Sequence, residues 1–256
     1  MRNNNHLEVT EAIRQMDAGS TEPVLCSCDD GNLYVVKSNA SVSRRELIHE
    51  YVASVLAKKI NLPIPDFAIV HIPSDIIDFL PPHLRGKLAC GYAFASQYIE
   101  DSASISFTLA HQLIDIQKQK EIYLFDRLIN NSDRSLTQLG GNVNIIYNVK
   151  KQSYYLIDHN LAFASDCDIE MFEYHVFSPR NRDWQYDMFD AISNEELIER
   201  INSSCNDALA EIPYEWIDDN SSQKSIVDNI LHTVARGKDG AFRSTIIWKY
   251  HYFTAS

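Results

Sequence analysis

The sequence predicts an α+β fold of two lobes, an N-terminal antiparallel sheet lobe with one helix and a mainly helical C-terminal lobe. Three observations predict it. Short β-rich runs separated by turn residues fill much of the stretch 24–99, one helix of clear apolar period interrupts them at 43–60, and helical patterns dominate after residue 104. The polar stretch 100–104 has low β propensity, so we expect the lobes to span residues 1–100 and 101–256.

Composition limits the classes of function. A chain of 256 residues with 45% hydrophobic residues can bury a large core, and its net charge of −12 argues against a nucleic-acid binder that uses a basic face. The chain has no apolar run of about 18 residues and its start lacks a signal-peptide core. We therefore expect a cytoplasmic protein with no membrane or direct nucleic-acid partner. Its five scattered cysteines indicate reduced thiols rather than a disulfide framework.

The first strands surround a turn-rich loop. Residues 8–18 suit a helix or a strand, residues 19–23 form the loop, and the runs 24–28 and 33–37 form a hairpin around Asp-Asp-Gly-Asn, with Lys37 at its end. In a nucleotide-binding lobe, Gly19, Ser20 and Thr21 would cover phosphates while Lys37 reaches them. A surface hairpin with a solvated lysine is the alternative.

The single helix of the first lobe is predicted over 43–60. Ser43 and Glu46 have the spacing of a capping box, and the sequence Asn-Leu-Pro after residue 60 ends the helix. Glu50 lies on this helix and either pairs with Lys37 or is solvated. The runs 67–72 and 92–99 complete a five-stranded sheet, with a loop and a short helix between them.

The second lobe is predicted to be helical apart from one strand pair. We expect helices at 109–118, 121–130, 193–205, 207–212 and 222–236, with a capping box formed by Ser193 and Glu196 at the start of the third. The runs 143–148 and 154–157 suit strands, and 242–253 suits either state. No internal repeat interrupts this order.

Polar residues around this strand pair suit phosphoryl transfer, which needs a carboxylate to orient the hydroxyl and an amide and a second carboxylate for Mg²⁺. Asp133, Asn142 and Asp158 fit these roles in order. Asp126 and Asn131, five residues apart, are the alternative pair, but Asp126 falls inside an apolar helix pattern, whereas Asp133 follows the helix end in a loop. Asn144 is the alternative to Asn142 for the metal.

Several blocks of residues 15–165 resemble the HipA-like kinases in their short bacterial form. They are Gly19-Ser20-Thr21-x-Pro23, Tyr34-Val35-Val36-Lys37, His49-Glu50-Tyr51, Leu62-Pro63-Ile64-Pro65, Asn131-Ser132-Asp133-Arg134, Asn142-Val143-Asn144 and Leu156-Ile157-Asp158-His159. The same core is similar to the phosphoinositide lipid kinases.

The resemblance implies a bilobed protein-kinase-like fold that uses ATP and Mg²⁺ to phosphorylate a serine or threonine of a protein, and it admits an antitoxin-type partner. The resemblance implies that Lys37 holds the ATP phosphates and that Glu50 steadies Lys37. It also implies that Asp133 is the catalytic carboxylate and that Asn142 and Asp158 bind Mg²⁺. Gly19, Ser20 and Thr21 would form the phosphate loop, and the hinge that reads the adenine would be Gln97, Tyr98 and Ile99.

Two other readings stay open from the sequence. The acceptor could instead be a small molecule or a lipid headgroup. The interval of nine residues from Asp133 to Asn142 exceeds the family's usual five, which favours a non-catalytic pseudokinase that acts by contact.

Overall fold

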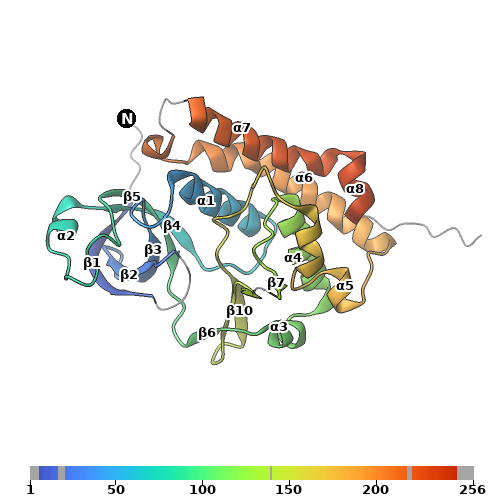
Figure 1. Cartoon of the computed structure of the whole chain (residues 1–256), viewed down its shortest axis with the longest axis horizontal. Coiled ribbons are helices and arrows are strands. Elements are labelled where there is room, and N and C mark those ends of the chain that lie inside the picture. The colour runs from blue at the N-terminus through green and yellow to red at the C-terminus, as the bar shows by residue number, and fades with distance from the viewer. Residues whose placement is uncertain (1–5, 17–20, 139, 218–220, 247–256) are drawn as a thin grey trace, which may run out of the picture.

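The computed structural model describes residues 6–16, 21–138, 140–217 and 221–246. A small barrel lies at one end of the molecule and helices form the other (Figure 1). The predicted phosphate-loop residues Gly19 and Ser20 lie outside the described residues, whereas Thr21 lies within them.

Five strands close the barrel in the order β1-β2-β3-β5-β4. All neighbours are antiparallel except β1 and β4, which are parallel where the barrel closes. The segment 8–18, which suited either state, is thus mainly a strand. The strands are β1 (Leu7–Gln15), β2 (Val24–Cys28), β3 (Leu33–Lys37), β4 (Phe67–Ile72) and β5 (Gly91–Gln97).

The barrel has its own small core. Alternate residues of β2 point inward, so Cys26 and Cys28 both lie in the barrel interior, beside valines from other strands. A loop that contains the short helix α2 (Ser74–Asp78) contributes Leu80, Leu84 and Leu88 to the same core.

Helix α1 (Arg44–Lys59) lies between the barrel and the helical lobe (Figure 1). Its N-terminus has the predicted capping box of Ser43 and Glu46. The helix is buried on most sides, and Leu47, Ile48 and Leu56 belong to one large core with Phe125 of α4 and Ile201 of α6. The helix therefore packs into the helical lobe as well as onto the outside of the barrel.

The second lobe is mainly helical. Its α-helices are α3 (Phe107–Leu113), α4 (Ile116–Leu128), α5 (Pro179–Arg182), α6 (Met188–Ala210), α7 (Ser221–Ala235) and α8 (Gly240–Ile246). Its 3-10 helices are η1 (Ile169–Tyr174), η2 (Tyr214–Trp216) and η3 (Arg236–Lys238). Its strands are β6 (Ser102–Ser104), β7 (Leu136–Thr137), β8 (Gly140–Gly141), β9 (Ile145–Asn148) and β10 (Ser153–Leu156).

Two of the predicted helix boundaries were wrong. The helices predicted at 193–205 and 207–212 form one helix, α6, which starts earlier because Asp187 and Asp190 form a capping box upstream of Ser193. The break between α3 and α4 lies at residues 114–115, where Ile114 is extended and Asp115 caps α4.

Side-chain hydrogen bonds join the region after α6 to the barrel and to α1. The Trp216 indole Nε1 donates to the Tyr92 carbonyl oxygen at 3.1 Å, and the Tyr51 hydroxyl donates to the Glu211 carboxylate at 2.6 Å. Both bonds connect the region after α6 to the barrel or to α1. They fix the two lobes relative to each other on this side.

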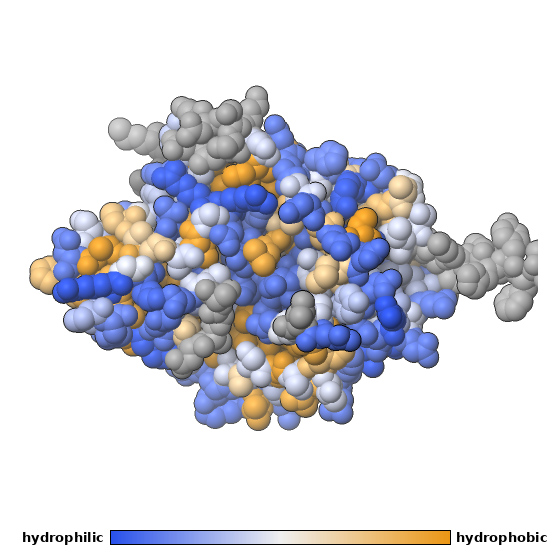
Figure 2. Space-filling view, viewed as in Figure 1, coloured by the Kyte–Doolittle hydropathy of each residue, from blue (hydrophilic) through white to orange (hydrophobic). Residues whose placement is uncertain are grey.

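The visible surface is mainly hydrophilic, with apolar side chains gathered in small patches (Figure 2). Among the described helices, none combines the length and hydrophobicity that spanning a bilayer requires.

Candidate active site

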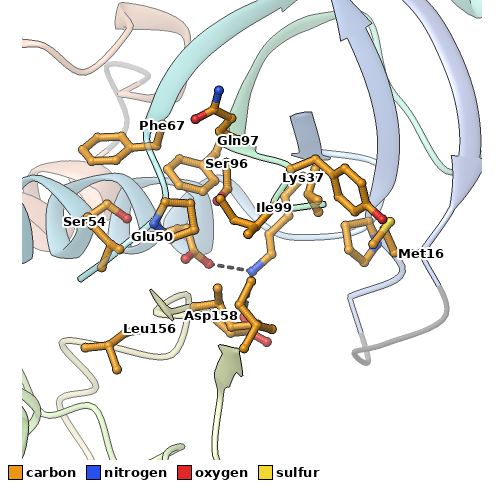
Figure 3. Close-up of a pocket in the computed structure, with 18 of the residues that line it drawn as sticks. Met16, Lys37, Glu50, Ser54, Phe67, Ser96, Gln97, Ile99, Leu156 and Asp158 are labelled. Carbon is orange, nitrogen blue, oxygen red and sulfur yellow. Dashed lines mark hydrogen bonds and ion pairs between the residues drawn. The ribbon is translucent and has the colours of Figure 1, made fainter. Parts of the chain in front are cut away.

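A cavity of about 340 Å³ lies between the barrel and the second lobe, and Figure 3 shows side chains converging on it. Apolar side chains, among them Val35, Phe94 and Leu156, line it. The charged side chains of Lys37, Glu50 and Asp158 line it too. Thr21 and the predicted hinge residues Gln97, Tyr98 and Ile99 line it as well.

Three charged side chains meet at this cavity from three elements. Lys37 ends β3, Glu50 lies on α1, and Asp158 follows β10 with a left-handed backbone of φ 63°. The Lys37 ammonium donates to Glu50 Oε2 at 2.6 Å and to Asp158 Oδ1 at 2.7 Å (Figure 3). The other Glu50 oxygen, Oε1, accepts from the backbone amide of His159 at 2.9 Å, so Glu50 connects β3 to the Asp158 loop.

Burial and the neighbouring charges shift the pKa values of these three side chains in opposite directions. Burial tends to lower the pKa of Lys37, but the carboxylates of Glu50 and Asp158 raise it above its usual value. Burial raises the pKa of Glu50, whereas Lys37 holds the pKa of Asp158 below its usual value despite burial. One cation thus stands between two carboxylates, which favours a further cation at Asp158.

Asp133 lies in the loop after α4, as its position after the helix pattern predicted. Its Oδ2 accepts from the Asn144 amide Nδ2 at 2.7 Å. Burial raises the pKa of Asp133, and the nearby Asp158 charge raises it further, against the lowering effect of the Asn144 hydrogen bond. Asp133 and Asp158 therefore lie near enough to interact.

Asn142 and Asn144 occupy different environments. Asn142 is exposed, and its Oδ1 accepts from the Asn144 backbone amide at 3.1 Å, so its side chain caps the turn. Asn144 is only 2% exposed and has a left-handed backbone of φ 51°, which turns its side chain toward Asp133. The structure thus brings Asn144, rather than Asn142, to Asp133.

A backbone hydrogen bond joins the loop that contains Asn144 to the loop that contains Asp158. The Ile157 amide donates to the Asn144 carbonyl oxygen at 3.0 Å, next to the pairing of Leu156 with Ile145 in β9 and β10. This pairing holds Asn144 and Asp158 at adjacent strand ends. The sequence suggested such an arrangement for Asn142, which precedes the predicted strand 143–148, and the structure has Asn144 in that place.

The residues present fit a hard divalent cation. The Asn144 carbonyl oxygen Oδ1 is buried and has no hydrogen-bond partner in the described chain. Amide and carboxylate oxygens are the ligand types that Mg²⁺ prefers. Within the described ranges, no cluster of three or more His, Cys, Asp or Glu side chains is placed to hold a metal ion.

Sequence reasoning missed a buried group beneath these loops. Asp126, Arg134 and His175 are each fully buried, and Arg134 donates to Asp126 Oδ2 at 2.8 Å. Asp126, the alternative catalytic carboxylate, is therefore enclosed beneath the loop and not exposed in the cleft. The only sequence signal was a charged residue inside an apolar helix pattern, since such residues need a buried partner.

Comparisons with known proteins identify the family and the fold. A family model described as HipA-like kinase matches residues 9–246. The proinflammatory kinase CtkA of Helicobacter pylori is similar in structure over 90% of this chain and 92% of its own, with a TM-score of 0.57 and 11% identity. A Golgi casein kinase is similar over 91% of this chain and 71% of its own, with a TM-score of 0.50 and 11% identity.

HipA of Shewanella oneidensis MR-1, in a structure with HipB and operator DNA, gives a TM-score of 0.49 with 12% identity, over 89% of this chain and 65% of its own. None of the curated proteins compared matches the sequence. The predicted family and the predicted bilobed kinase-like fold are both confirmed by the family match and by the structural similarity to CtkA. With sheet lobe, cleft and helical lobe in this order, the chain belongs to the HipA-like kinase family.

Proposed function

We propose that this protein uses ATP and Mg²⁺ to transfer the γ-phosphoryl group to a serine or threonine hydroxyl of a protein substrate. The observation that carries the proposal is Lys37, held between Glu50 and Asp158 at the cavity. An ammonium on a strand, supported by a helix carboxylate and facing a carboxylate that can bind a metal, is the arrangement that protein kinases use for phosphoryl transfer.

The apolar side chains of the cavity suit the adenine ring. Val35, Phe94 and Leu156 are among them, and the predicted hinge 97–99 begins at Gln97, the last residue of β5. The amides of Gln97 and Tyr98 already donate to the carbonyl oxygens of Asp66 and Leu33. We therefore propose that the backbone amide of Ile99, the next residue of the hinge, donates a hydrogen bond to the adenine edge.

Lys37 and the residues before β2 suit the phosphates. An ammonium has three donor hydrogens, and the bonds to Glu50 and Asp158 use two of them, so one remains for a phosphate oxygen. Thr21 lines the same cavity, and we keep Gly19 and Ser20 in the proposed phosphate loop.

We assign the metal to Asn144 and Asp158 in place of the predicted pair of Asn142 and Asp158. The buried, unpartnered Oδ1 of Asn144 supports this choice, and the exposed side chain of Asn142 argues against its role. When bound, Mg²⁺ neutralises charge that develops on the transferred phosphoryl group. The long interval from Asp133 to Asn142, which favoured a pseudokinase, loses its weight because Asn144 lies at Asp133.

Asp133 is our candidate for the carboxylate that orients the acceptor. Its Oδ2 is held by Asn144, which leaves Oδ1 to accept the substrate hydroxyl proton. In the reaction, the hydroxyl oxygen forms a bond to the γ-phosphorus while the bond to the leaving ADP oxygen breaks. The hydroxyl proton passes to Asp133 and then to solvent. The raised pKa of Asp133 suits this transient proton acceptance.

The test uses γ-labelled ATP with Mg²⁺, the purified chain and a cell extract. Label on phosphoserine or phosphothreonine of a protein is expected. Label on a lipid or a small molecule would show that the acceptor belongs to that class and not to proteins. Absence of label with intact ATP binding would favour a pseudokinase. An antitoxin-type partner, which membership of the family suggests, would be sought among the proteins retained by the chain.

Variants test the assigned roles. Asp133→Asn should retain ATP binding, measured as thermal stabilisation, and lose turnover by about 10²-fold or more. Asn144→Ala should weaken Mg²⁺-dependent binding by at least about tenfold, while Asn142→Ala should change it little. Full activity in Asp133→Asn, or the opposite order of the two asparagine variants, would refute the assignments.

A further inference from the structure

A fully buried hydrogen-bonded network lies beneath the proposed catalytic loop. At its centre Asp126 of α4 accepts three side-chain hydrogen bonds: from Asn131 Nδ2 at 2.8 Å, Arg134 Nε at 2.8 Å and His175 Nε2 at 2.9 Å. Asp126, Arg134 and His175 have no exposed surface, and Asn131 has none either. The proposed function assigns none of these residues a role.

The proton positions in the network follow from its partners. His175 Nδ1 accepts from the Phe177 backbone amide at 3.1 Å, so its proton lies on Nε2, which donates to Asp126. Burial lowers the pKa of His175, which keeps the ring neutral. Burial would raise the pKa of Asp126, but Arg134 and His175 hold it below its usual value. The network therefore contains one carboxylate and one guanidinium.

The other end of Arg134 reaches both loops of the proposed metal site. Its NH1 donates to the Asn144 carbonyl oxygen at 2.5 Å and to the Val143 carbonyl oxygen at 3.3 Å. Its NH2 donates to His159 Nε2 at 3.1 Å, directly after Asp158. Because a guanidinium is rigid and planar, these bonds fix the backbone of Asn144 relative to the ring of His159.

The segment after η1 is joined to the same loop. The Val176 amide donates to the Arg134 carbonyl oxygen at 3.0 Å, and His175 forms a β-bridge with Ser135. The segment thus contacts the catalytic loop through its backbone and contacts Asp126 through the His175 ring.

We propose that Arg134 is a positioning residue that sets Asn144 and the 157–159 loop in place, and that Asp126 and His175 hold Arg134 in its orientation. The inference rests on the proposed function for the metal role of Asn144 and Asp158. It makes the segment 175–178 part of the support of the active site.

Stability alone is a weak explanation for the network. A buried ion pair contributes little net stability relative to apolar side chains of similar volume, because its desolvation is costly. The Arg134 donors are directed at the loop carbonyls, His159 and Asp126 rather than at a single partner. Such a fork is suited to holding several backbone segments in one geometry.

A matched control is available in the same lobe. Lys120 of α4 and Asp190 of α6 form another buried ion pair, with an Nζ–Oδ2 distance of 2.5 Å, and Asp190 is 4% exposed. Asp190→Asn removes one buried carboxylate charge, as Asp126→Asn does, but it touches neither proposed metal-site loop.

The first measurement is amide hydrogen exchange in segments 142–146 and 157–160, relative to α7, for Asp126→Asn, Arg134→Lys, His175→Gln and Asp190→Asn. We expect faster exchange in both segments for the first three variants and not for Asp190→Asn. Equal changes in the Asp190→Asn control, or unchanged exchange in the network variants, would overturn the proposal. Three separate network variants keep the test decisive if one of them does not fold.

The second measurement is the Mg²⁺ concentration that gives half-maximal phosphoryl transfer. We expect it to rise by about tenfold or more in the network variants and to stay unchanged in Asp190→Asn, because loss of folded protein lowers the rate without changing the metal requirement. An unchanged metal requirement in Asp126→Asn and His175→Gln would contradict the positioning role. If the wild type transfers no phosphoryl group, the proposed function fails, and the exchange experiment still decides the positioning role.

Discussion

Replacement of Glu50 by glutamine tests the centre of the cleft with almost no change of shape. Glu50 is 3% exposed and accepts from two donors, Lys37 at 2.6 Å and the His159 amide at 2.9 Å. A glutamine side chain has one oxygen and one NH₂ group. In either orientation, its NH₂ would therefore face a buried donor.

The expected cost follows from this conflict. One buried donor left without an acceptor costs about 1–3 kcal/mol. Breaking a buried ion pair completely costs roughly 3–5 kcal/mol of unfolding free energy. We expect a smaller loss in Glu50→Gln, because Lys37 keeps its hydrogen bond to the Asp158 carboxylate at 2.7 Å. Because the Glu50 carboxylate is buried, its charge has a desolvation cost, and glutamine removes that cost. We expect a net loss of about 1–3 kcal/mol of unfolding free energy.

Urea denaturation of wild type and Glu50→Gln measures this loss, and ATP titration measures its effect on the cleft. Lys37 would turn wholly to Asp158, so we expect at least about tenfold weaker use of ATP. Glu46→Gln, one turn earlier on α1, is the control, because Glu46 bonds Asn160 and Ser43 and not Lys37. If both variants lose the same stability and ATP dependence is unchanged, the assigned role of Glu50 is wrong.

Three further predictions follow from burial, backbone geometry and lobe contacts. Gly141→Ala should destabilise the protein by more than about 2 kcal/mol in urea denaturation, because an added Cβ would lie 2.0 Å from the Ser135 carbonyl oxygen, whereas Gly140→Ala, with positive φ but open space, should cost less. Burial lowers the pKa of His49 to about 4, so the unfolded chain binds more protons and stability falls as pH decreases from about 6.5 toward 4. His49→Gln should remove about 2 kcal/mol of the loss between pH 7.5 and pH 5, and an unchanged pH profile would contradict this pKa. Tyr51→Phe should lower the unfolding free energy by about 1 kcal/mol through loss of the Glu211 hydrogen bond, and equal stability in thermal melts would show that this bond contributes nothing.

Local patterns predicted much of the barrel and of α1. The capping residues Ser43 and Glu46 are both in place, and β2 and β3 form the expected hairpin. For α6 the sequence analysis identified only the capping box of Ser193 and Glu196, and the structure has another cap upstream of it. The upstream cap at Asp187 starts the helix, and the buried positions Asp190, Asn194 and Leu197 then continue in one phase.

The metal side of the site depended on contacts that no local pattern contains. Asn142 and Asn144 are two residues apart, and the sequence favoured Asn142 because it immediately precedes the apolar run 143–146. The left-handed backbone at Asn144 and the bonds from Arg134 and Ile157 to its carbonyl oxygen decide which side chain turns inward. These partners are 10 and 13 residues away along the chain, so the choice is tertiary.

Helix α1 shares its core with α4 and α6, whereas the barrel interior is a separate core. Lys37 thus ends a strand of the barrel, whereas Glu50 lies on a helix that is packed into the core of the second lobe. If the barrel rocked away from the helices, the 2.6 Å contact between these side chains would be among the first to lengthen. In this architecture the distance between the Lys37 and Glu50 side chains would report how far the cleft has opened. Helix α1 could move independently of the second lobe only if its side chains left the core of that lobe.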